Sequence, residues 1–236
     1  MMDKKIPLYM KVKEQLLLAI NRMVVGKNRL PTEISLVEKL GVTRSTLREA
    51  INQLALEKVI KKIPGKGMVA FPSVNRLSFR MDNYADFRML LEKSGTVHIE
   101  STDIAIQEPS KRMLRRMPEA EGKKVYTWVR KHYLNDQLVI YAYFEIPVDN
   151  FTKSSIDEKE MPFADYLKEY VTQDIAYHIS WIKSRRDSEL AEAFGSQDDI
   201  IESWDQVFKD HKDESVCFCQ LSFHPDIIDL SIVIAP

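Results

Sequence analysis

The sequence predicts an α+β chain in two parts: three helices with a β-hairpin, and then an antiparallel sheet flanked by a few helices. Three observations favour this fold class. Apolar residues recur at helical spacing between residues 8 and 54, strand-like runs dominate after residue 97, and the charge is divided between the two parts.

The net charge of −1 conceals a separation along the 236 residues. Residues 1–72 hold 14 Lys and Arg and 6 Asp and Glu, whereas residues 73–236 hold 20 and 29. A basic segment joined to an acidic one indicates that the first segment alone meets a polyanion such as nucleic acid. Phe71-Pro72-Ser73 favours an extended connection at the same place. We therefore expect one domain over residues 1–72 and a second over residues 73–236.

The composition is 44% hydrophobic and 29% charged, as in ordinary globular proteins. No apolar run approaches the roughly 18 residues that a membrane span needs, and the N-terminus does not read as a secretory signal. The two cysteines, Cys217 and Cys219, lie two residues apart on an expected strand and cannot easily bridge. These features predict a reducing, cytoplasmic setting without membrane association.

The residues before the expected hairpin predict three helices. The first spans residues 8–24, with Pro7 just before it, where a missing N–H costs nothing. Thr32 is the expected N-cap of the second helix, which ends at Gly41, and Thr43 is the expected cap of the third. The side chains expected to be buried on the second and third helices are Ile34, Leu36, Val37, Leu40, Leu47, Ala50, Ile51 and Leu54.

A β-hairpin follows the third helix. Its strands are expected at residues 59–63 and 68–71, and Pro64-Gly65-Lys66-Gly67 forms the tip. Three helices and a hairpin in about 70 residues are typical of a winged helix-turn-helix.

The start of the third helix carries groups that can read DNA. Arg donates two hydrogen bonds to guanine, and Ser or Thr can contact thymine methyls or phosphates. These residue types stand at Thr43, Arg44, Ser45, Thr46 and Arg48, next to a helix N-terminus that itself attracts phosphate. The alternative is a helical hairpin with ordinary solvated charges, which the hairpin at the right distance and the divided charge disfavour.

Residues 7–71 resemble the DNA-binding domain of the GntR family of bacterial transcription regulators. The resemblance rests on Pro7-Leu8-Tyr9, Arg29–Glu33, Gly41–Ala50 and the hairpin tip Gly65-Lys66-Gly67. It implies that Arg44, Arg48 and the hairpin tip contact operator DNA. One position departs, since Ile34 stands where the family usually carries a DNA-contacting Arg. The full set of candidate DNA-binding residues is Arg29, Thr43, Arg44, Ser45, Thr46, Arg48, Lys66 and Gly67.

The second part reads as strands with a few helices. Strands are expected at 97–106, 124–134, 138–146, 174–185, 200–209, 215–223 and 229–235, and helices at 84–94, 165–170 and 187–194. Asn135-Asp136 is the turn of a hairpin. Arg112, Arg115 and Arg116 are interpreted as a solvated helix face.

Residues 77–234 resemble the UTRA effector domain of the HutC-type subfamily, whose fold is similar to chorismate lyase. The resemblance rests on residues 129–133, 140–147, 175–182 and 222–226. It implies a domain that binds a small metabolite, often a phosphorylated sugar, and tunes DNA affinity. The phosphosugar pattern is poorly kept. Arg130 matches its first arginine, but His132 occupies the position of the second, and Ala142 and Pro162 stand about where the pattern has an acidic residue and a serine.

The candidate effector-binding residues come from three expected strands. Arg130 and His132 share one strand face, and Tyr141, Tyr143 and Glu145 share a face of the next strand. If both faces look into one pocket, they form a mixed cationic and aromatic site that Tyr177 could also reach. The alternative is that the tyrosines are core residues and Arg130 an ion-pair partner.

The sequence thus predicts a homodimeric, ligand-responsive regulator of transcription that binds double-stranded operator DNA and a small effector. It favours a repressor over an activator. No catalytic residue, metal site or cofactor is expected, since Cys217 and Cys219 with His211 and His224 lack strong metal spacing. Two alternatives stay open: a lyase-like enzyme with a DNA-binding head, and a DNA-binding protein without an effector.

Overall fold

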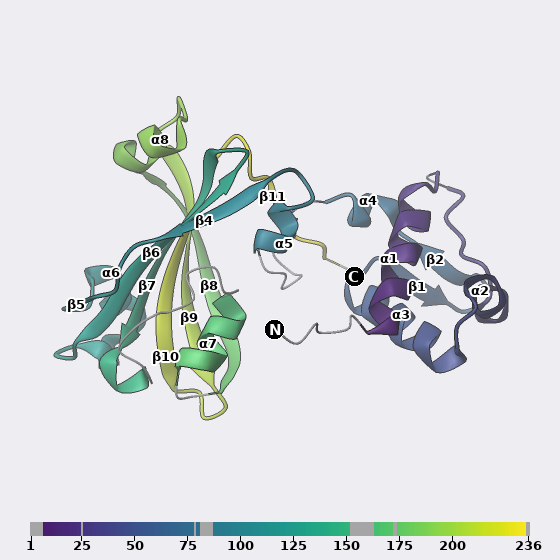
Figure 1. Cartoon of the computed structure of the whole chain (residues 1–236), viewed down its shortest axis with the longest axis horizontal. Helices are drawn as coiled ribbons and strands as arrows, with labels where there is room; N and C mark the ends of the chain where they lie inside the picture. The colour runs from purple at the N-terminus through teal and green to yellow at the C-terminus, as the bar shows by residue number, and fades with distance from the viewer. Residues whose placement is uncertain are drawn as a thin grey trace. The chain divides into compact units, whose positions relative to one another are not determined.

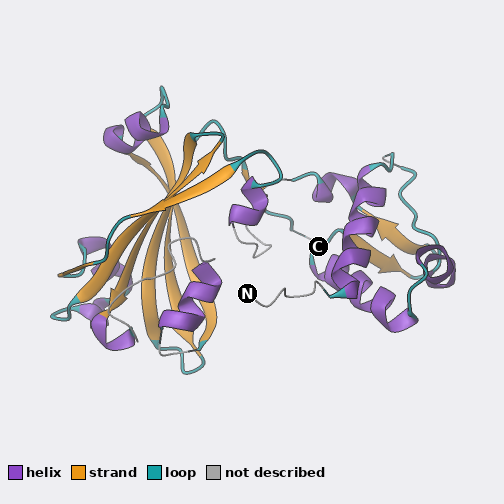
Figure 2. Cartoon of the chain, in the orientation of Figure 1, coloured by secondary structure: helices purple, strands orange, loops and turns teal. Residues whose placement is uncertain are grey.

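The computed structural model describes residues 7–24, 26–77, 79–80, 87–151, 163–171 and 174–234. It divides into two compact units (Figures 1 and 2). The head unit contains the described residues up to Arg80 together with those from Leu230 onward, and the body unit contains those from Phe87 to Asp229. A helical first part and a strand-rich second part confirm the predicted α+β fold class.

The head unit is built on α1 (Leu8–Asn21), α2 (Glu33–Leu40) and α3 (Arg44–Leu56). Its core joins one face of each helix to the hairpin, with Val12, Leu16, Ile20, Leu36, Leu47, Ala50, Leu54 and Met68 buried. The expectation for Ile34 was wrong, because its side chain is 59% exposed. Ile34 lies two residues before buried Leu36, which is about 200° around the helix and away from the core.

The hairpin pairs β1 (Ile60–Ile63) with β2 (Gly67–Ala70) in antiparallel register. Gly65 and Gly67 at its tip have φ of 75° and 80°, a left-handed conformation that side chains with a Cβ rarely adopt. A short helix, α4 (Pro72–Asn75), follows directly.

The head unit includes more of the chain than the domain expected over residues 1–72. After α4, β3 (Phe79–Arg80) pairs in parallel with β11 (Leu230–Ser231), the remnant of the strand expected at 229–235. The Arg80 guanidinium donates to the Glu57 carbonyl at the end of α3, and Lys58 donates to the Val233 carbonyl. These hydrogen bonds attach both segments to the end of α3. The position of Pro72 in the sequence could not reveal them.

The body unit contains a seven-stranded antiparallel sheet (Figure 1). Six strands follow the order β4 (Val97–Ser101), β6 (Val125–Leu134), β7 (Gln137–Pro147), β10 (Ser215–Phe223), β9 (Ile200–Asp210) and β8 (Ile175–Arg186), and β5 (Ala105–Gln107) pairs with the other end of β6. One strand had been expected over 97–106, but the chain leaves the ladder between Ser101 and Ala105. Asn135 and Asp136, both at positive φ, make the predicted turn between β6 and β7.

Strand register defines two faces of this sheet, because residues opposite each other in a ladder project to the same side. The Arg130 face carries Trp128, Arg130 and His132 of β6, Ala142 and Phe144 of β7, Cys219, Leu221 and Phe223 of β10, and Glu202, Trp204 and Gln206 of β9. The Glu145 face carries Tyr141, Tyr143 and Glu145 of β7, Phe218, Gln220 and Ser222 of β10, and Ser203, Asp205 and Val207 of β9.

Helices pack on both faces. α7 (Phe163–Tyr170) and α5 (Phe87–Leu91) contact the Arg130 face through Tyr166 against Trp128 and Phe87 against Trp204. α6 (Lys111–Arg116), continued by η1 (Pro118–Ala120), and α8 (Ser188–Phe194) pack on the Glu145 face. A further 3-10 turn, η2 (Val148–Asn150), follows β7. Because both faces are covered, β10 is buried from Val216 to Phe223 rather than alternating.

Across the described ranges, no helix is both long enough and apolar enough to cross a membrane.

Removing the C-terminal segment should loosen the end of α3. A chain ending at Asp229 loses the β11 pairing, the Lys58–Val233 bond and the hydrogen bond from Ser231 Oγ to the Phe79 carbonyl at 3.1 Å. At about 0.5–1.5 kcal/mol for each hydrogen bond, the head should lose roughly 1–3 kcal/mol. Faster amide hydrogen exchange at the end of α3 is the expected result. The control Ile234→Ala, at a side chain that is 80% exposed, should match the parent chain. Unchanged exchange in the deletion would refute the attachment.

Candidate functional site

The turn between α2 and α3 is fixed by three local contacts. Thr32 accepts a hydrogen bond from the Ser35 amide at 3.3 Å, which confirms it as the cap of α2. Gly41 ends α2 in the left-handed conformation, with φ of 64°. Thr43 Oγ1 accepts from the Thr46 amide at 3.2 Å, so α3 begins where the sequence predicts.

The structure brings three predicted DNA-binding residues together at the start of α3. Thr43 Oγ1 lies 2.9 Å from Ser45 Oγ and 2.8 Å from Thr46 Oγ1. This hydroxyl cluster sits beside the free amides of the first helical turn, where a phosphate oxygen is attracted. The arrangement can hold a DNA backbone against the helix end.

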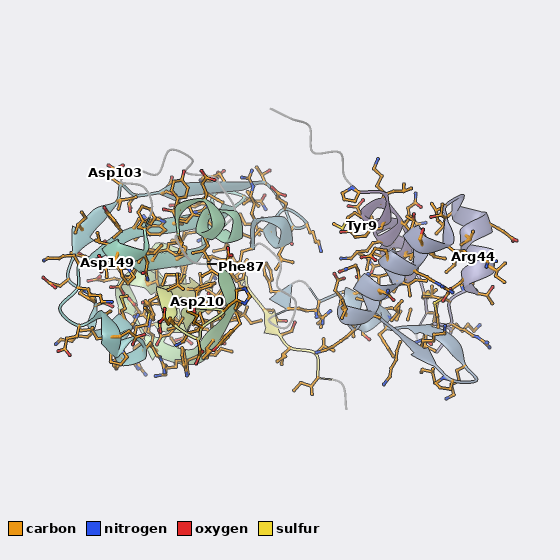
Figure 3. All side chains as sticks on the ribbon, turned by 90° about the horizontal axis from the view of Figure 1, so that it is seen from below. Tyr9, Arg44, Phe87, Asp103, Asp149 and Asp210 are labelled. Carbon is orange, nitrogen blue, oxygen red and sulfur yellow. The ribbon has the colours of Figure 1, made fainter. Side chains whose placement is uncertain are left out.

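The two arginines of α3 differ in their surroundings. Arg44 is exposed and extends outward from the ribbon (Figure 3). Arg48 is 65% exposed, but its Nε donates to Glu33 Oε2 at 3.0 Å, and Lys62 Nζ lies 3.6 Å from the other Glu33 oxygen. The Arg48 hydrogen bond, opposed by some burial and aided by the charges of Arg48 and Lys62, lowers the pKa of Glu33. Glu33 therefore links α2, α3 and the hairpin.

The remaining predicted DNA-binding residues lie in the hairpin or, in the case of Arg29, beside it. Arg29 forms an isolated bridge with Val69 and is exposed. Its Nη2 would lie 3.4 Å from a Cβ added at Gly67, so the guanidinium covers the tip where a side chain would intrude. Lys66 is exposed on the same tip. The head thus presents one cationic group from the tip beside the guanidinium of Arg29.

The predicted single effector pocket is not formed, because the β6–β7 register separates its residues. Arg130 pairs with Ala142, whereas Val129 pairs with Tyr143. Arg130 and His132 therefore project from one side of the sheet, and Tyr143 and its neighbours from the other. Adjacent strands in register share a face only at opposed positions, and the sequence reasoning did not fix that register.

Tyr177 lies apart from both groups. It pairs with Lys209 on the outermost strand, its side chain is 45% exposed, and its hydroxyl hydrogen-bonds Asp213. This hydrogen bond chiefly raises the pKa of the tyrosine. Tyr177 therefore cannot complete a site around Arg130.

The Glu145 face holds a polar layer whose groups are paired with one another. Glu145 is fully buried and accepts from the amide of Ser110 at 2.7 Å and from its hydroxyl at 2.6 Å. Burial raises the pKa of Glu145, although the Ser110 hydrogen bonds oppose this. Tyr143 accepts from Gln107 Nε2 at 2.6 Å. These groups act as a structural anchor for the start of α6, whose cap is Ser110.

Arg112 and Arg116 of α6 extend this layer and were wrongly expected to form a solvated face, whereas Arg115 is exposed as expected. Arg112 hydrogen-bonds the buried Gln220, and Arg116 lies 3.4 Å from a carboxylate oxygen of buried Asp205 and 4.1 Å above the Trp181 ring. A helix that covers a sheet must place some long side chains against it, so the charges here are paired rather than solvated.

The Arg130 face differs, because ring nitrogens on it are buried without a hydrogen-bond partner among the residues that the structure describes. These are Trp128 Nε1, His132 Nδ1 and Trp204 Nε1. Their residues and Arg130 are each at most 8% exposed. Buried polar groups are normally satisfied, so such a cluster is where a bound molecule would supply the missing partners.

His132 is neutral at physiological pH. Burial first, then the charges of Arg130 and Arg88, lowers the pKa of His132 from its ordinary 6.5 to about 3. The sequence reasoning selected this histidine but missed Trp128, Trp204, Phe87 and Tyr166, which surround the same face. Trp128 could have been found from its spacing of two from Arg130 on one strand. Trp204 could not, because its place depends on β9.

Sequence reasoning also weighed Cys217 and Cys219 as metal ligands. Both thiols are free and buried, and burial raises the pKa of each. Within the described ranges, no three His, Cys, Asp or Glu side chains gather as metal ligands do. Pro162, which stands where phosphosugar sites have a serine, lies outside the described residues.

His132 should make the folded state sensitive to acid. The unfolded histidine takes up a proton near its ordinary pKa of 6.5, but the folded one does so only near 3. The stabilisation is therefore complete above about pH 6.5 and is lost as the pH falls towards 3, by up to roughly 4–5 kcal/mol. Urea unfolding of His132→Gln should have a flatter pH dependence over this range. The exposed-site control His211→Gln should keep the original slope, and identical slopes in all three proteins would contradict the assignment.

Comparison with known proteins shows what the two units are similar to. Residues 8–69 match the family described as bacterial regulatory proteins, gntR family. The chain is 30% identical over 148 residues to YurK of Bacillus subtilis, an uncharacterized HTH-type transcriptional regulator. The aligned region covers 61% of this chain and 60% of YurK. It is 28% identical over 180 residues to the histidine utilization repressor of Pseudomonas putida, covering 72% of this chain and 64% of the repressor. The chain therefore spans less than two thirds of these curated relatives.

Solved structures share the fold over more of the chain. The structure of YydK from Bacillus subtilis has a TM-score of 0.72 at 13% identity and covers 98% of this chain and 100% of YydK. PhnF from Mycobacterium smegmatis has a TM-score of 0.56 at 14% identity and covers 95% and 99%. The effector domain of PhnF alone has a TM-score of 0.52 at 11% identity, over 64% of this chain and 94% of that domain. This chain therefore carries the DNA-binding domain of the gntR family of bacterial transcription regulators, joined to a second domain with the fold of an effector domain.

Proposed function

We propose that this chain is a homodimeric repressor of transcription that reads an operator with α3 and the hairpin and is controlled by a small molecule bound in the body unit. As a regulator of transcription it acts in the cytoplasm, on the chromosome. The observation that carries the proposal is made at the start of α3. There the exposed Arg44 and Arg48 lie next to a cluster of hydroxyls that includes the helix cap. Names of relatives support repression, since two of them are histidine utilization repressors.

Base reading falls to Arg44 and Arg48. Both stand in the first turns of α3, from which a recognition helix contacts base edges in the major groove. The Arg48–Glu33 ion pair does not prevent this, because an exposed pair contributes only about 0–1 kcal/mol. A guanine edge that accepts two hydrogen bonds can replace Glu33 as the partner.

The hairpin supplies contacts that do not depend on base sequence. Lys66 at the tip and Arg29 beside Gly67 suit the phosphate backbone, and the absence of a Cβ at Gly67 permits close approach. Such contacts set register and orientation on the duplex, whereas the α3 arginines provide specificity.

Control by a small molecule is supported by the Arg130 face. It combines a buried guanidinium with three buried ring nitrogens that have no partner among the described residues. A ligand that pairs with them binds the arrangement it completes and disfavours any other. In a homodimer, two heads would meet half-sites about 34 Å apart, and a coupling of about 1–3 kcal/mol would change operator affinity roughly 5- to 150-fold.

Removing either arginine should weaken operator binding. Arg44→Ala and Arg48→Ala should each cost about 1–3 kcal/mol against an operator selected from random duplexes and should relax base preference at one position. The control is Arg22→Ala, which removes an exposed charge after α1. Fluorescence anisotropy at several salt concentrations measures the affinities. If both variants bound like the parent, α3 would not be the reading element.

Ile34 should respond in the opposite direction. It is 59% exposed in the first turn of α2, where the family usually carries an arginine that reaches DNA. Ile34→Arg should tighten binding and steepen the dependence of log affinity on log salt by about 0.9 for one added phosphate contact. Ile34→Ala controls for loss of the exposed apolar side chain. Unchanged affinity and site preference in the arginine variant would show that α2 does not approach DNA.

A further inference from the structure

Glu33 is an acidic side chain that lies among the cationic groups of α3 and the hairpin. It stands in the first turn of α2, and its carboxylate meets cations from two other elements. Glu33 Oε2 accepts from Arg48 Nε of α3 at 3.0 Å, and Oε1 lies 3.6 Å from Lys62 Nζ of β1. The side chain of Glu33 is 27% exposed, and those of Arg48 and Lys62 are 65% and 78% exposed. Because an anion at this place repels the phosphates of DNA, its position calls for a physical explanation.

The hydrogen bond from Arg48 to Glu33 uses the guanidinium nitrogen nearest the main chain. A guanidinium is a rigid planar fork, with one N–H on Nε and the other N–H groups on the two terminal nitrogens. A guanine edge accepts a pair of hydrogen bonds from such a fork, at O6 and N7. Both can come from the terminal nitrogens while Nε still donates to Glu33. The exchange of Glu33 for a guanine costs little, but this geometry does not require it.

The carboxylate of Glu33 restrains the guanidinium of Arg48 before DNA arrives. One carboxylate oxygen faces α3 and the other faces β1, so cations on two elements hold the plane of the carboxylate. The Arg48 hydrogen bond is the main cause of the lowered pKa of Glu33, which keeps the carboxylate ionised at physiological pH. An arginine that is already oriented loses less conformational entropy when it binds a base. Arg44 makes no such ion pair in the part of the chain that the structure describes.

The same carboxylate weakens contacts that carry no information about base sequence. Arg48 and Lys62 share one anion, so they attract phosphate less strongly than two cations without it would. Attraction to phosphates supplies essentially all of the affinity for DNA of arbitrary sequence. A binding protein gains discrimination by lowering its affinity for the wrong partner as well as by adding contacts to the right one. The position of Glu33 serves both ends.

We propose that Glu33 is a specificity-determining residue of the head unit, which orients Arg48 towards a guanine and lowers the affinity for DNA of other sequence. Glu33 acts through Arg48 and Lys62 and is therefore a positioning residue, not a reader of bases. Arg44, which reads its own base pair, is independent of Glu33. This inference rests on the proposed function, because it requires that α3 reads an operator.

The test measures the affinity of the full-length chain for two duplexes, an operator selected with the parent chain and a shuffled duplex of the same composition. Glu33→Gln keeps the size of the side chain and removes its charge. Operator binding should weaken roughly two- to fivefold, as expected for the loss of an exposed ion pair, whereas the shuffled duplex should bind more tightly. For the shuffled duplex, the dependence of log affinity on log salt should steepen by about 0.9 for one added phosphate contact. Base preference should relax at the position read by Arg48 and persist at the position read by Arg44.

Matched variants separate the position of the carboxylate from its charge. Glu33→Asp keeps the charge but withdraws the carboxylate by one methylene, so it should weaken operator binding and leave the shuffled duplex unchanged. Glu38→Gln removes an exposed charge from the same helix and should shift the affinities for both duplexes alike. In an Arg48→Ala background, Glu33→Gln should leave base preference unchanged. Melting temperatures equal to that of the parent establish that each variant is folded.

The ratio of the two affinities distinguishes failure of this proposal from failure of the proposed function. If the ratio in Glu33→Gln equals that of a selective parent chain, the proposal is overturned and the proposed function stands. The same holds if Glu33→Gln lowers the ratio equally with and without Arg48, because Glu33 then does not act through that arginine. A parent chain that binds no selected duplex more tightly than the shuffled one overturns the proposed function, and the role of Glu33 with it.

Discussion

The register of β6 against β7 is the constraint on which the chemistry of the body unit depends. Arg130 stands opposite Ala142, and this pairing assigns every neighbouring side chain to one of two faces. A shift by one residue would bring Arg130 beside Glu145 and Tyr143 and would expose the aromatic residues to the other layer. The stacked pair Trp128 and Phe144 helps to hold the observed register, because slippage would separate two large buried rings.

Because both faces of the sheet are covered, a polar residue that is buried without a partner on either side destabilises the fold. The two faces differ in how their polar residues are paired. Helix α6 closes the Glu145 face with its own cap: Ser110 both begins the helix and binds the buried carboxylate. The Arg130 face is bounded by α5 and α7 through aromatic rings, which offer few hydrogen bonds. Within the described part of the chain, Trp128 Nε1, His132 Nδ1 and Trp204 Nε1 on that face have no hydrogen-bond partner.

In the head unit, local contacts fix the geometry of the helix-turn-helix. Thr32, Gly41 and Thr43 fix the ends of α2 and α3, so the angle between these helices follows from a few residues of sequence. Glu33 then restrains Arg48 and Lys62 by weak, exposed interactions. Breaking the exposed Arg48–Glu33 pair costs little, so Arg48 can exchange Glu33 for another hydrogen-bond acceptor.

The sequence by itself determined the winged helix-turn-helix, the helix caps, the β6–β7 turn and the exposed arginines of α3, because these features depend on neighbours within a few residues. It also placed Arg130 and His132 on one face of a strand. Only the tertiary structure decided that Tyr141, Tyr143 and Glu145 belong to the opposite face and that Trp204 and Phe87 join Arg130. Contacts between strands far apart in the chain follow from register and strand order, which periodicity alone does not specify. For the same reason, the return of Leu230 and Ser231 to β3, and the pairing of Arg112 and Arg116 of α6 with side chains of the sheet, became visible only in the folded chain.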